Sequence, residues 1–430
     1  MTDLLQDPAT SSDAAVRASH AVLTRLMAGY GPRDFGVRFW DVGEWPAERE
    51  ARFVLVLNHP GTLRAMLLPP NRLTIGEAYI FGDFDIEGDF DAFFAVMTHW
   101  GSRPRGLLEK AGIFWQLRKM PAAARARADR AARLSGATHS PDRDKQAIQY
   151  HYDVSNDFYA LWLDARRVYS CAYFKRPDED IDTAQRNKLD HICRKLRLEP
   201  GLKLLDIGCG WGGLIVHAAK EHGATAVGIT LSQAQKEYVE ELIGREGLAG
   251  RCRVELCDYR HLAERDFDRL VSVGMAEHVG AKLLPTYFRA AWERLKPGGL
   301  MMNHAIGYAA DFRNPPGPNF AQHYVFPDGE LVALNETLRA AETTGFEVRD
   351  VESLREHYDL TVRHWRRRLH ERAEEAKRIT SEVTFRIFDY YLAGAAMVLH
   401  TAKLSIYQTL LLKPTGAPSG LPLTRENLYR

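Results

Sequence analysis

The sequence predicts an α/β protein with a doubly wound, mainly parallel sheet and a smaller N-terminal α+β domain. Strand-like and helix-like stretches alternate from about residue 145, which is typical of parallel sheets covered by helices. The stretch LLDIGCGWGG (204–213) joins a buried-strand pattern to four glycines, as happens where a strand turns into a helix beside a nucleotide. Residues 20–100 instead mix short alternating stretches with turn signals, which favours an α+β module.

The elements of the doubly wound part follow in order along the sequence. A strand at 203–208 precedes a helix in GGLIVHAAKEHG (212–223), and a second strand covers 224–232. The next helix, 232–247, has Ser232 as its expected N-cap. Strands are then expected in 253–259 and 268–275, a helix at 285–295 and a further strand at 300–307. This order predicts a mainly parallel sheet.

The composition excludes several classes of protein. With 430 residues, 45% of them apolar and 26% charged, the chain is expected to form two or three globular domains. A net charge of +1 indicates no nucleic-acid partner. The five cysteines lack ligand spacing, so we expect no disulfide framework and no metal site. The polar, acidic start MTDLLQDPATSSD does not resemble a secretory signal, which favours a cytoplasmic protein.

We expect three parts: a small α+β domain at 1–100, a basic linker at 101–144 and the doubly wound domain at 145–430. Between residues 101 and 135, nine lysines and arginines stand against two acidic residues, with apolar and aromatic residues among them. This segment is either a helix that lies on anionic lipid headgroups or a solvated helical linker. The apolar stretch 390–412 is interrupted by His400 and Lys403, which favours an amphipathic core helix over a membrane span.

The spacing of the glycines indicates which class of nucleotide the turn can bind. A dinucleotide site has the pattern G-x-G-x-x-G and an acidic residue about 20 positions later. Here the pattern is G-x-G-x-G-G, and the second strand ends in GITLS without an acid, so NAD is disfavoured. The turn is also not a GxxxxGK[ST] phosphate loop. A nucleotide without a long phosphate chain is therefore expected; the alternative is that the glycines serve only strand–helix packing.

The DxGCGxGG turn resembles motif I of S-adenosylmethionine-dependent methyltransferases, where glycines let the backbone approach the cofactor closely. Outside the turn, the chain resembles the cyclopropane fatty acid synthases, including the mycolic acid cyclopropane synthases. The similar segments are HYDVSNDFYALWLD (151–164), YSCAYF (169–174), GITLSQAQ (228–235), GMAEHVG (274–280), NHAIG (303–307) and HYDLTVRHW (357–365). The resemblance implies a class I methyltransferase, Rossmann-like fold from about residue 145 onward. The basic N-terminal portion is similar to the extra domain of bacterial members that act on phospholipids.

The resemblance implies contacts of eight residues with S-adenosylmethionine, from its methionine end to its adenine. They are Tyr169 and Ser170 at the methionine end, Asp206, Gly208 and Gly210 at the glycine turn, Thr230 and Gln235 at the ribose, and Asp258 at the adenine.

The resemblance further implies transfer of a methylene group to the cis double bond of unsaturated acyl chains in phospholipids. The π electrons attack the sulfonium methyl, and the resulting carbocation must lose a proton before the cyclopropane ring closes. In the family the base is a bound bicarbonate ion. Its expected contacts are the backbone of Cys171 and Ile306 and the side chains of Glu277, His304 and Tyr358. Aromatic candidates for stabilising positive charge are Phe174, Tyr324 and Trp365.

Other functions stay open at this point. The same site could methylate an unsaturated chain without closing the ring, which leaves a methylene or methyl branch. A lipid-binding protein could keep the fold without turnover, and small-molecule N-methyltransferases share much of the scaffold. We also expect association with an anionic membrane surface at the inner face of the cell membrane, and the N-terminal portion could support a homodimer.

Overall fold

The computed structural model describes residues 14–40, 43–122, 134–152, 155–310 and 319–429. Contacts divide the chain into two units. The first comprises Met1–Ala131, Pro315–Val325 and Ser381–Met397, and the second comprises Ala132–Asn314, Phe326–Thr380 and Val398–Arg430. Two segments from the later part of the sequence thus belong to the first unit, so this division differs from the expected boundaries 1–100, 101–144 and 145–430.

The second unit contains a seven-stranded sheet with the order β10-β11-β9-β8-β5-β6-β7. Neighbours from β9 to β7 pair in parallel, and β11 is antiparallel to both β9 and β10. The strands are β5 (Lys203–Ile207), β6 (Thr225–Thr230), β7 (Cys252–Leu256), β8 (Phe267–Val273), β9 (Leu295–Tyr308), β10 (Glu347–Ser353) and β11 (Leu404–Leu412). The predicted doubly wound, mainly parallel sheet is confirmed.

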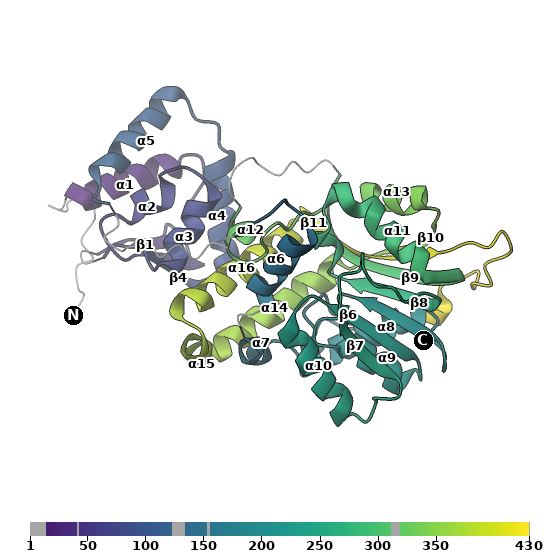
Figure 1. Ribbon diagram of the computed structural model, residues 1–430. Coiled ribbons are helices and arrows are strands. Elements are labelled where there is room, and N and C mark those ends of the chain that lie inside the picture. The colour runs from purple at the N-terminus through teal and green to yellow at the C-terminus, as the bar shows by residue number, and fades with distance from the viewer. Residues whose placement is uncertain (1–13, 41–42, 123–133, 153–154, 311–318, 430) are drawn as a thin grey trace. The chain divides into compact units, whose positions relative to one another are not determined.

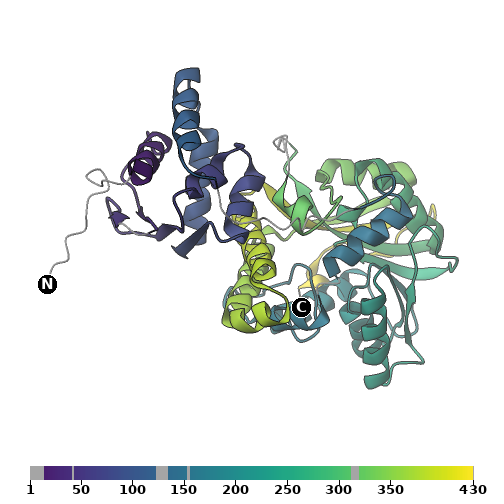
Figure 2. The same cartoon turned by 60° about the vertical axis from the view of Figure 1, so that its left-hand side comes forward.

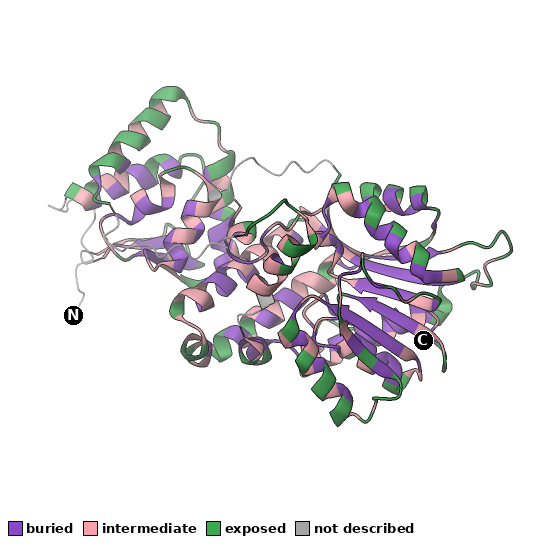
Figure 3. Cartoon of the chain, in the orientation of Figure 1, coloured by how far each residue is buried: buried purple, intermediate pink, exposed green. Residues whose placement is uncertain are grey.

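Helices cover both faces of this sheet, and its strands are buried between them (Figures 1 and 3). On one face, α8 (Ile181–Lys195), α9 (Gly213–Glu221) and α10 (Gln233–Arg245) share an apolar cluster with the strands. On the other, α11 (Leu284–Arg294) and α13 (Leu334–Thr344) share a second cluster. Within β5, Leu204 belongs to the first cluster and Leu205 to the second. Because side chains alternate along a strand, Asp206 points to the face covered by α8 and α9.

Local sequence signals explain where the helices of this unit begin. The N-cap Ser232 accepts a hydrogen bond from the N–H of Gln235 at 3.2 Å, as its position in the sequence predicts. Asp180 caps α8 in the same way, through the N–H of Thr183. The remaining α-helices of the unit are α6 (Pro141–Tyr152), α7 (Asn156–Trp162), α14 (Arg355–Glu371) and α15 (Ala373–Ile379).

The prediction of one core helix across 390–412 is wrong for its second half. Helix α16 (Glu382–His400) ends at His400, Ala402 adopts a φ of +56°, and the following residues form β11. This strand lies between β9 and β10 and is buried at most positions on both faces. Its sequence therefore lacks the alternation of a half-exposed strand, which made it resemble a helix. Across the described ranges, no helix has the length and apolar character needed to cross a bilayer.

The first unit is an α+β fold, as predicted for the N-terminal region. Its four-stranded sheet has the order β2-β1-β3-β4, with Phe35, Phe53 and Phe84 fully buried on it. The strands are β1 (Phe35–Arg38), β2 (Glu44–Trp45), β3 (Phe53–Leu57) and β4 (Phe84–Gly88). The helices are α1 (Ala14–Leu26), α2 (Thr62–Leu67), α3 (Arg72–Ile80), α4 (Phe90–Ser102), α5 (Leu107–Lys119), α12 (Phe320–Tyr324) and most of α16.

Buried polar contacts join α16 to the N-terminal part of this unit. The hydroxyl of Tyr79 donates to Asp389 at 2.5 Å, and the guanidinium of Arg386 pairs with Asp85. Helix α5 falls within the segment expected to be a linker, and it projects from the rest of the unit in both views (Figures 1 and 2). The cations at 125, 127, 130 and 133 of that segment lie outside the described residues.

Candidate active site

The glycine turn between β5 and α9 creates space for a ligand. Gly208 and Gly210 have φ angles of +82° and +54°, a conformation that residues with a side chain rarely adopt. A Cβ atom on Gly210 would meet no other atom within 4 Å, so its absence leaves the space beside the turn open. The N–H groups of Gly208 and Cys209 both donate to the carbonyl of Ile229 at 3.0 Å. These two bonds fix the turn against β6.

A pocket of about 540 Å³, part of it open to solvent, lies beside this turn at the carboxyl ends of β5, β6 and β8. Strand β6 lies on one side of β5 and β8 on the other, which is the switch point where ligands of such sheets bind. The lining residues are Ile148, Ile207, Gly208, Gly210, Ile229, Thr230, Leu231, Gln235, Cys257, Tyr259, Val273, Gly274, Met275 and His278. They include four of the eight residues expected to contact the cofactor.

Thr230 and Gln235 replace the acidic residue of a dinucleotide site. The hydroxyl of Thr230 donates to the side-chain oxygen of Gln235 at 2.7 Å, and both residues are buried. The side-chain nitrogen of Gln235 is buried without a hydrogen-bond partner among the described residues. An amide donor of this kind at the pocket wall fits a ligand that carries hydroxyl groups, such as a ribose.

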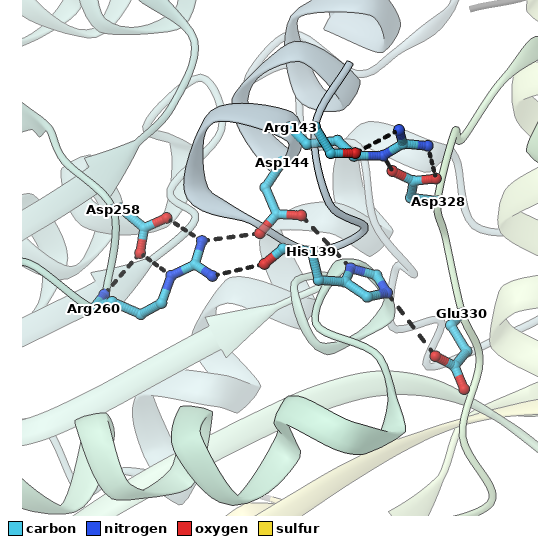
Figure 4. Close-up of polar contacts among 8 residues, drawn as sticks. His139, Arg143, Asp144, Asp258, Arg260, Asp328 and Glu330 are labelled. Atoms are coloured by element: carbon cyan, nitrogen blue, oxygen red, sulfur yellow. Dashed lines mark hydrogen bonds and ion pairs between the residues drawn. The ribbon is translucent and has the colours of Figure 1, made fainter. Parts of the chain in front are cut away.

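The carboxylate of Asp258, the expected adenine contact, is hydrogen-bonded to Arg260 (Figure 4). Its carboxylate accepts from the backbone N–H of Arg260 at 2.8 Å and from the guanidinium at 2.8 and 2.6 Å. Burial alone would raise the pKa of Asp258, but these bonds hold the pKa below its usual range. Its neighbours Cys257 and Tyr259 line the pocket, whereas Asp258 does not.

The same arginine attaches helix α6 to the pocket (Figure 4). The guanidinium of Arg260 also donates to Asp144 at 2.9 Å and to the carbonyl of His139 at 3.0 Å. At the start of α6, Arg143 pairs with Asp328 at 2.5 Å. Ile148, one turn beyond Asp144, lines the pocket. Helix α6 is therefore one wall of the pocket and is held there by charged side chains.

Tyr169 and Ser170 lie beside the glycine turn rather than in the pocket lining. A Cβ on Gly213, at the end of the turn, would lie 2.9 Å from the side chain of Val168, which places this segment directly against the turn. The ring of Tyr169 packs among Tyr159, Trp162 and Trp365, with centroids 5.2–5.5 Å away. The hydroxyl oxygen of Ser170 accepts a hydrogen bond from Lys188 at 2.9 Å.

Two buried charged groups lie near the glycine turn: Lys188, whose ammonium contacts Ser170, and Asp206, which belongs to β5. Burial raises the pKa of Asp206 to about 7, although the positive charge of Lys188 opposes the shift. One carboxylate oxygen of Asp206 has no hydrogen-bond partner among the described residues. Sequence reasoning did not select Lys188. The signal was there: Gln185, Lys188 and Ile192 are spaced as the buried stripe of a helix, so two polar residues stand where apolar ones are usual.

The residues expected to hold bicarbonate gather around the end of β9. Cys171 is part of a small apolar cluster with Leu354 and Ile406, against which Ile306 and Tyr358 pack. The carboxylate of Glu277 accepts a hydrogen bond from the backbone N–H of Ile306 at 2.8 Å. His304 lies two residues before Ile306 on the same strand. The structure thus brings four of the five residues into contact and places the fifth on the adjoining part of β9.

Two of these residues present buried polar atoms without partners. Oε2 of Glu277 and Nε2 of His304 are buried and have no hydrogen-bond partner among the described residues. Burial raises the pKa of Glu277 to about 7, against the lowering effect of the Ile306 N–H. Burial lowers the pKa of His304 well below its usual range, so its imidazole is neutral. Atoms of this kind suit a small polar guest such as bicarbonate, because such groups otherwise cost free energy when buried.

The aromatic candidates are divided between the two units. Trp365 is 1% exposed, and its ring is tilted against that of Tyr169 and edge-on to that of Tyr358, with centroids 5.2 and 6.2 Å away. Phe174 is stacked on His364 at 5.4 Å. Tyr324 belongs to the first unit, where its hydroxyl donates to Glu77. Trp365 therefore has ring contacts with two residues of the expected site, Tyr169 and Tyr358, and this favours it as an aromatic wall.

The strand order, the glycine turn and the pocket at the switch point define a class I S-adenosylmethionine-dependent methyltransferase. Solved structures agree: the cyclopropane synthase MmaA2 from Mycobacterium tuberculosis is 32% identical, with a TM-score of 0.60 over 63% of this chain and 98% of that chain. The mycolic acid cyclopropane synthase CmaA1 complexed with SAH and CTAB gives a TM-score of 0.59 at 32% identity, over 63% of this chain and 98% of that chain.

The model of the mycolic acid cyclopropane synthetase family matches residues 139–409, and the chain belongs to this family. A probable fatty acid methyltransferase of Pseudomonas putida is 38% identical over 92% of this chain and 96% of its own length. The cyclopropane-fatty-acyl-phospholipid synthase of Escherichia coli K12 is 37% identical over 64% of this chain and 69% of its own length. The protein is therefore an enzyme that transfers methyl groups from S-adenosylmethionine to lipid chains.

Proposed function

We propose that this enzyme transfers a methylene group to the cis double bond of unsaturated acyl chains in phospholipids and closes a cyclopropane ring. The observation that carries this proposal is the position of Glu277. Its neighbours Met275 and His278 line the cofactor pocket, and its own carboxylate accepts from the N–H of Ile306, which packs against the small cluster around Cys171. A proton acceptor placed there borders the transferred methyl group, which must lose a proton before the ring closes.

The residues of the chain have separate tasks in this reaction. Gly208, Gly210, Thr230 and Gln235 bind the adenosine part of S-adenosylmethionine, which supplies the electrophilic methyl group. Attack by the double bond forms one carbon–carbon bond and releases S-adenosylhomocysteine, and loss of a proton from the new methyl group allows the second carbon–carbon bond to form. Aromatic faces such as that of Trp365 stabilise the intermediate carbocation.

Bicarbonate, when bound by the backbone of Cys171 and Ile306 and by Glu277, His304 and Tyr358, supplies the base for that proton. The unpartnered atoms of Glu277 and His304 support this assignment. A neutral imidazole at His304 can donate one hydrogen bond to an anion without adding a competing charge. Because the Ile306 N–H donates to Glu277 in the structure, Glu277 and the anion would share this donor.

A second candidate is methylation without ring closure, which leaves a branched chain. It is favoured by the full-length match to the fatty acid methyltransferase of Pseudomonas putida. Mass alone cannot separate the two products, since a ring and a methylene branch both add CH2. The test incubates the enzyme with S-adenosylmethionine and vesicles of cis-unsaturated phospholipid, then hydrogenates the released acyl chains under mild conditions. Ring closure predicts added CH2 and no uptake of hydrogen, whereas uptake of hydrogen by the product would establish the branching reaction.

We further propose that α5 holds the enzyme peripherally on the anionic inner face of the cell membrane. Its outward side carries Leu107, Leu108 and Trp115, which are 85%, 91% and 64% exposed. Phe114 continues this side and lies under the guanidinium of Arg118, 5.7 Å from the ring centroid. We call this surface the α5 patch, and it includes the neighbouring cations Lys110 and Lys119. Apolar side chains bordered by cations are typical of helices that lie in the headgroup region of anionic membranes.

The same N-terminal portion would support a homodimer. Light scattering of the purified enzyme without lipid tests this, since a monomeric mass at working concentration contradicts it.

A further inference from the structure

Four side chains with metal-binding atoms meet between helices α8 and α9. Asp190 and Cys193 come from α8, His217 comes from α9, and His222 is the residue that caps the end of α9. One ligand atom each of Cys193, His217 and His222 lie within 4.8 Å of one another. Oδ1 of Asp190 lies 2.9 Å from Nε2 of His217 and 3.4 Å from Nε2 of His222. We call these four residues the α8–α9 cluster.

The geometry of the two helices explains how the cluster forms. Asp190 and Cys193 are three positions apart in α8, so they share one face of that helix. His217 and His222 are five positions apart and would not face each other on a continuous helix. Because α9 ends at Glu221, the ring of His222 returns to that of His217, with centroids 5.7 Å apart. The expectation of no metal site rested on ligand spacing along the chain, and a set divided between two helices has no such spacing.

The donor atoms of the cluster suit a zinc-like ion. Sulfur and imidazole nitrogen bind ions such as Zn²⁺, whereas Mg²⁺ and Ca²⁺ prefer oxygen. With Cys193 as thiolate and Asp190 as carboxylate, the ligands carry two negative charges, which balance a divalent ion. Tetrahedral zinc with bonds of about 2.3 Å to sulfur and about 2.0 Å to nitrogen places these ligand atoms about 3.5 Å apart. The cluster therefore needs to contract by only about 1 Å to bind the ion.

The cluster is buried on its inner side and open on its outer side. Cys193 is fully buried and the side chain of His217 is 6% exposed, whereas that of Asp190 is 42% exposed. An ion can therefore enter from solvent past Asp190, as a metal site requires. Within the part of the chain that the structure describes, the Cys193 thiol has no hydrogen-bond partner, whereas the thiols of Cys171 and Cys257 donate to backbone carbonyls at 3.2 and 3.3 Å.

We propose that the α8–α9 cluster binds one zinc ion, which fastens α8 to α9. The ion is bound by Cys193 Sγ, by one nitrogen of each histidine and by the carboxylate of Asp190. When the sulfur–zinc bond forms, the proton of the thiol leaves to solvent. None of these residues is assigned to the cofactor or to bicarbonate, so the role of the ion is structural. Helix α9 begins where the glycine turn ends, and the ion therefore stabilises the helices beside that turn.

Metal binding by the full-length enzyme, prepared without a histidine tag, tests this proposal. The enzyme is reduced, freed of metal with a chelator, and then titrated with Zn²⁺ or with Co²⁺ as a spectroscopic probe. We expect about one zinc ion per chain after dialysis and a higher Tm in its presence. Cobalt should give a thiolate-to-metal charge-transfer band and the intense visible bands of a tetrahedral site.

Variants show whether the ion occupies the cluster. Cys193→Ser should remove the charge-transfer band, and Cys252→Ser, which changes another buried thiol of the same apolar cluster, should retain it. His222→Gln changes a partly exposed helix end and should fold. It should weaken zinc about a hundredfold or more, since the loss of an outer-shell partner alone costs about 10–100-fold. The exposed His261→Gln is its control and should bind zinc as the native enzyme does.

Three results would each overturn the proposal. The first is a native enzyme that retains no zinc after dialysis, and the second is a cobalt complex without the charge-transfer band. The third is equal zinc affinity of His222→Gln and His261→Gln, because the ion would then be bound elsewhere. Should Cys193→Ser not fold, the comparison of the two histidine variants still decides.

Discussion

The carboxylate of Glu277 accepts a hydrogen bond from the backbone N–H of Ile306 at 2.8 Å, just past the point where β8 ends. The last residue pair of β8 and β9 is Val273 with His304, so the N–H of Ile306 has no strand to pair with on this side. One residue of the cofactor-pocket loop is thereby joined to Ile306, which packs against the small cluster around Cys171. The proposed chemistry requires this proximity, since methyl transfer and loss of a proton occur at the same carbon.

Replacing Glu277 with Gln should lower kcat by about a hundredfold or more, the usual scale for losing a group that assists proton transfer. The amide oxygen can still accept from Ile306, so the backbone should stay in place. The affinity for S-adenosylhomocysteine should change less than about threefold. Steady-state kinetics and calorimetry check both values, and a kcat close to that of the native enzyme would contradict the role of Glu277.

His304→Ala should sharply reduce turnover and leave cofactor affinity nearly intact. His304 is 1% exposed and contacts Gln408 on the neighbouring strand at 3.2 Å, whereas it does not line the cofactor pocket. Single-turnover methyl transfer and titration with S-adenosylhomocysteine separate the two effects. A large loss of cofactor binding would count against this assignment. Gln408→Met, which removes only the neighbour of the imidazole, tests whether its orientation matters.

Asp206→Asn should make the thermal stability less dependent on pH. The pKa of Asp206 is raised to about 7 by burial, so the folded protein binds a proton more tightly than the unfolded chain does. This contribution to stability is present at low pH and is lost as the pH rises through about 7. Relative to the native enzyme, the Tm of the variant should therefore increase between about pH 5 and about pH 8. The exposed Asp178→Asn is the control, and a constant difference in Tm would contradict the prediction.

Arg260→Met should loosen helix α6 and speed the release of S-adenosylhomocysteine. Arg260 joins Asp144 of α6 to Asp258, and Ile148 of α6 lines the pocket. Removing the guanidinium leaves two partly buried carboxylates without their common partner, which is costly. Hydrogen exchange over residues 139–152 should increase, with an off-rate raised about tenfold or more. Lys236→Met, which breaks a surface ion pair with Glu240, should leave both unchanged.

Leu108→Asp combined with Trp115→Asp should abolish binding to anionic vesicles. Both side chains belong to the α5 patch and are largely exposed, so the fold does not depend on their burial. Sedimentation with anionic and with zwitterionic vesicles at two salt concentrations measures the loss of vesicle binding and shows how much of that binding is electrostatic. Leu423→Asp is the matched control, because Leu423 is fully exposed outside α5. If the control and the double variant bind alike, the α5 patch is not the membrane surface.

The sequence predicted the parts of the fold that local patterns determine. Strand β5, its glycine turn and the cap at Ser232 depend on residues close together in the chain, and all are found in the structure. The assignment of 404–412 failed because a strand buried on both faces has no polar alternation.

The sequence predicted the candidate site less completely than the fold. Gly208, Thr230 and Gln235, which motif spacing specifies, line the pocket. The engagement of Asp258 by its near neighbour Arg260 was not foreseen. The second bond of Arg260, to Asp144, depends on a contact between residues more than a hundred positions apart. Lys188 was missed although the buried stripe of α8 in which it lies can be read from the sequence, whereas the contact of its ammonium with Ser170 is visible only in the fold.

The position of β11 affects how the protein is made. Among the described strands, β10 pairs only with β11, which also completes the pairing of β9, although fifty residues separate the end of β10 from the start of β11. During translation, the edge of β9 and the whole of β10 stay without their neighbour until residue 412 has left the ribosome. For that interval the nascent chain presents open strand edges, which are prone to aggregate. Slow synthesis of the last segment, or its loss by a nonsense mutation, would therefore increase the need for chaperones more than a destabilising substitution in the first unit would.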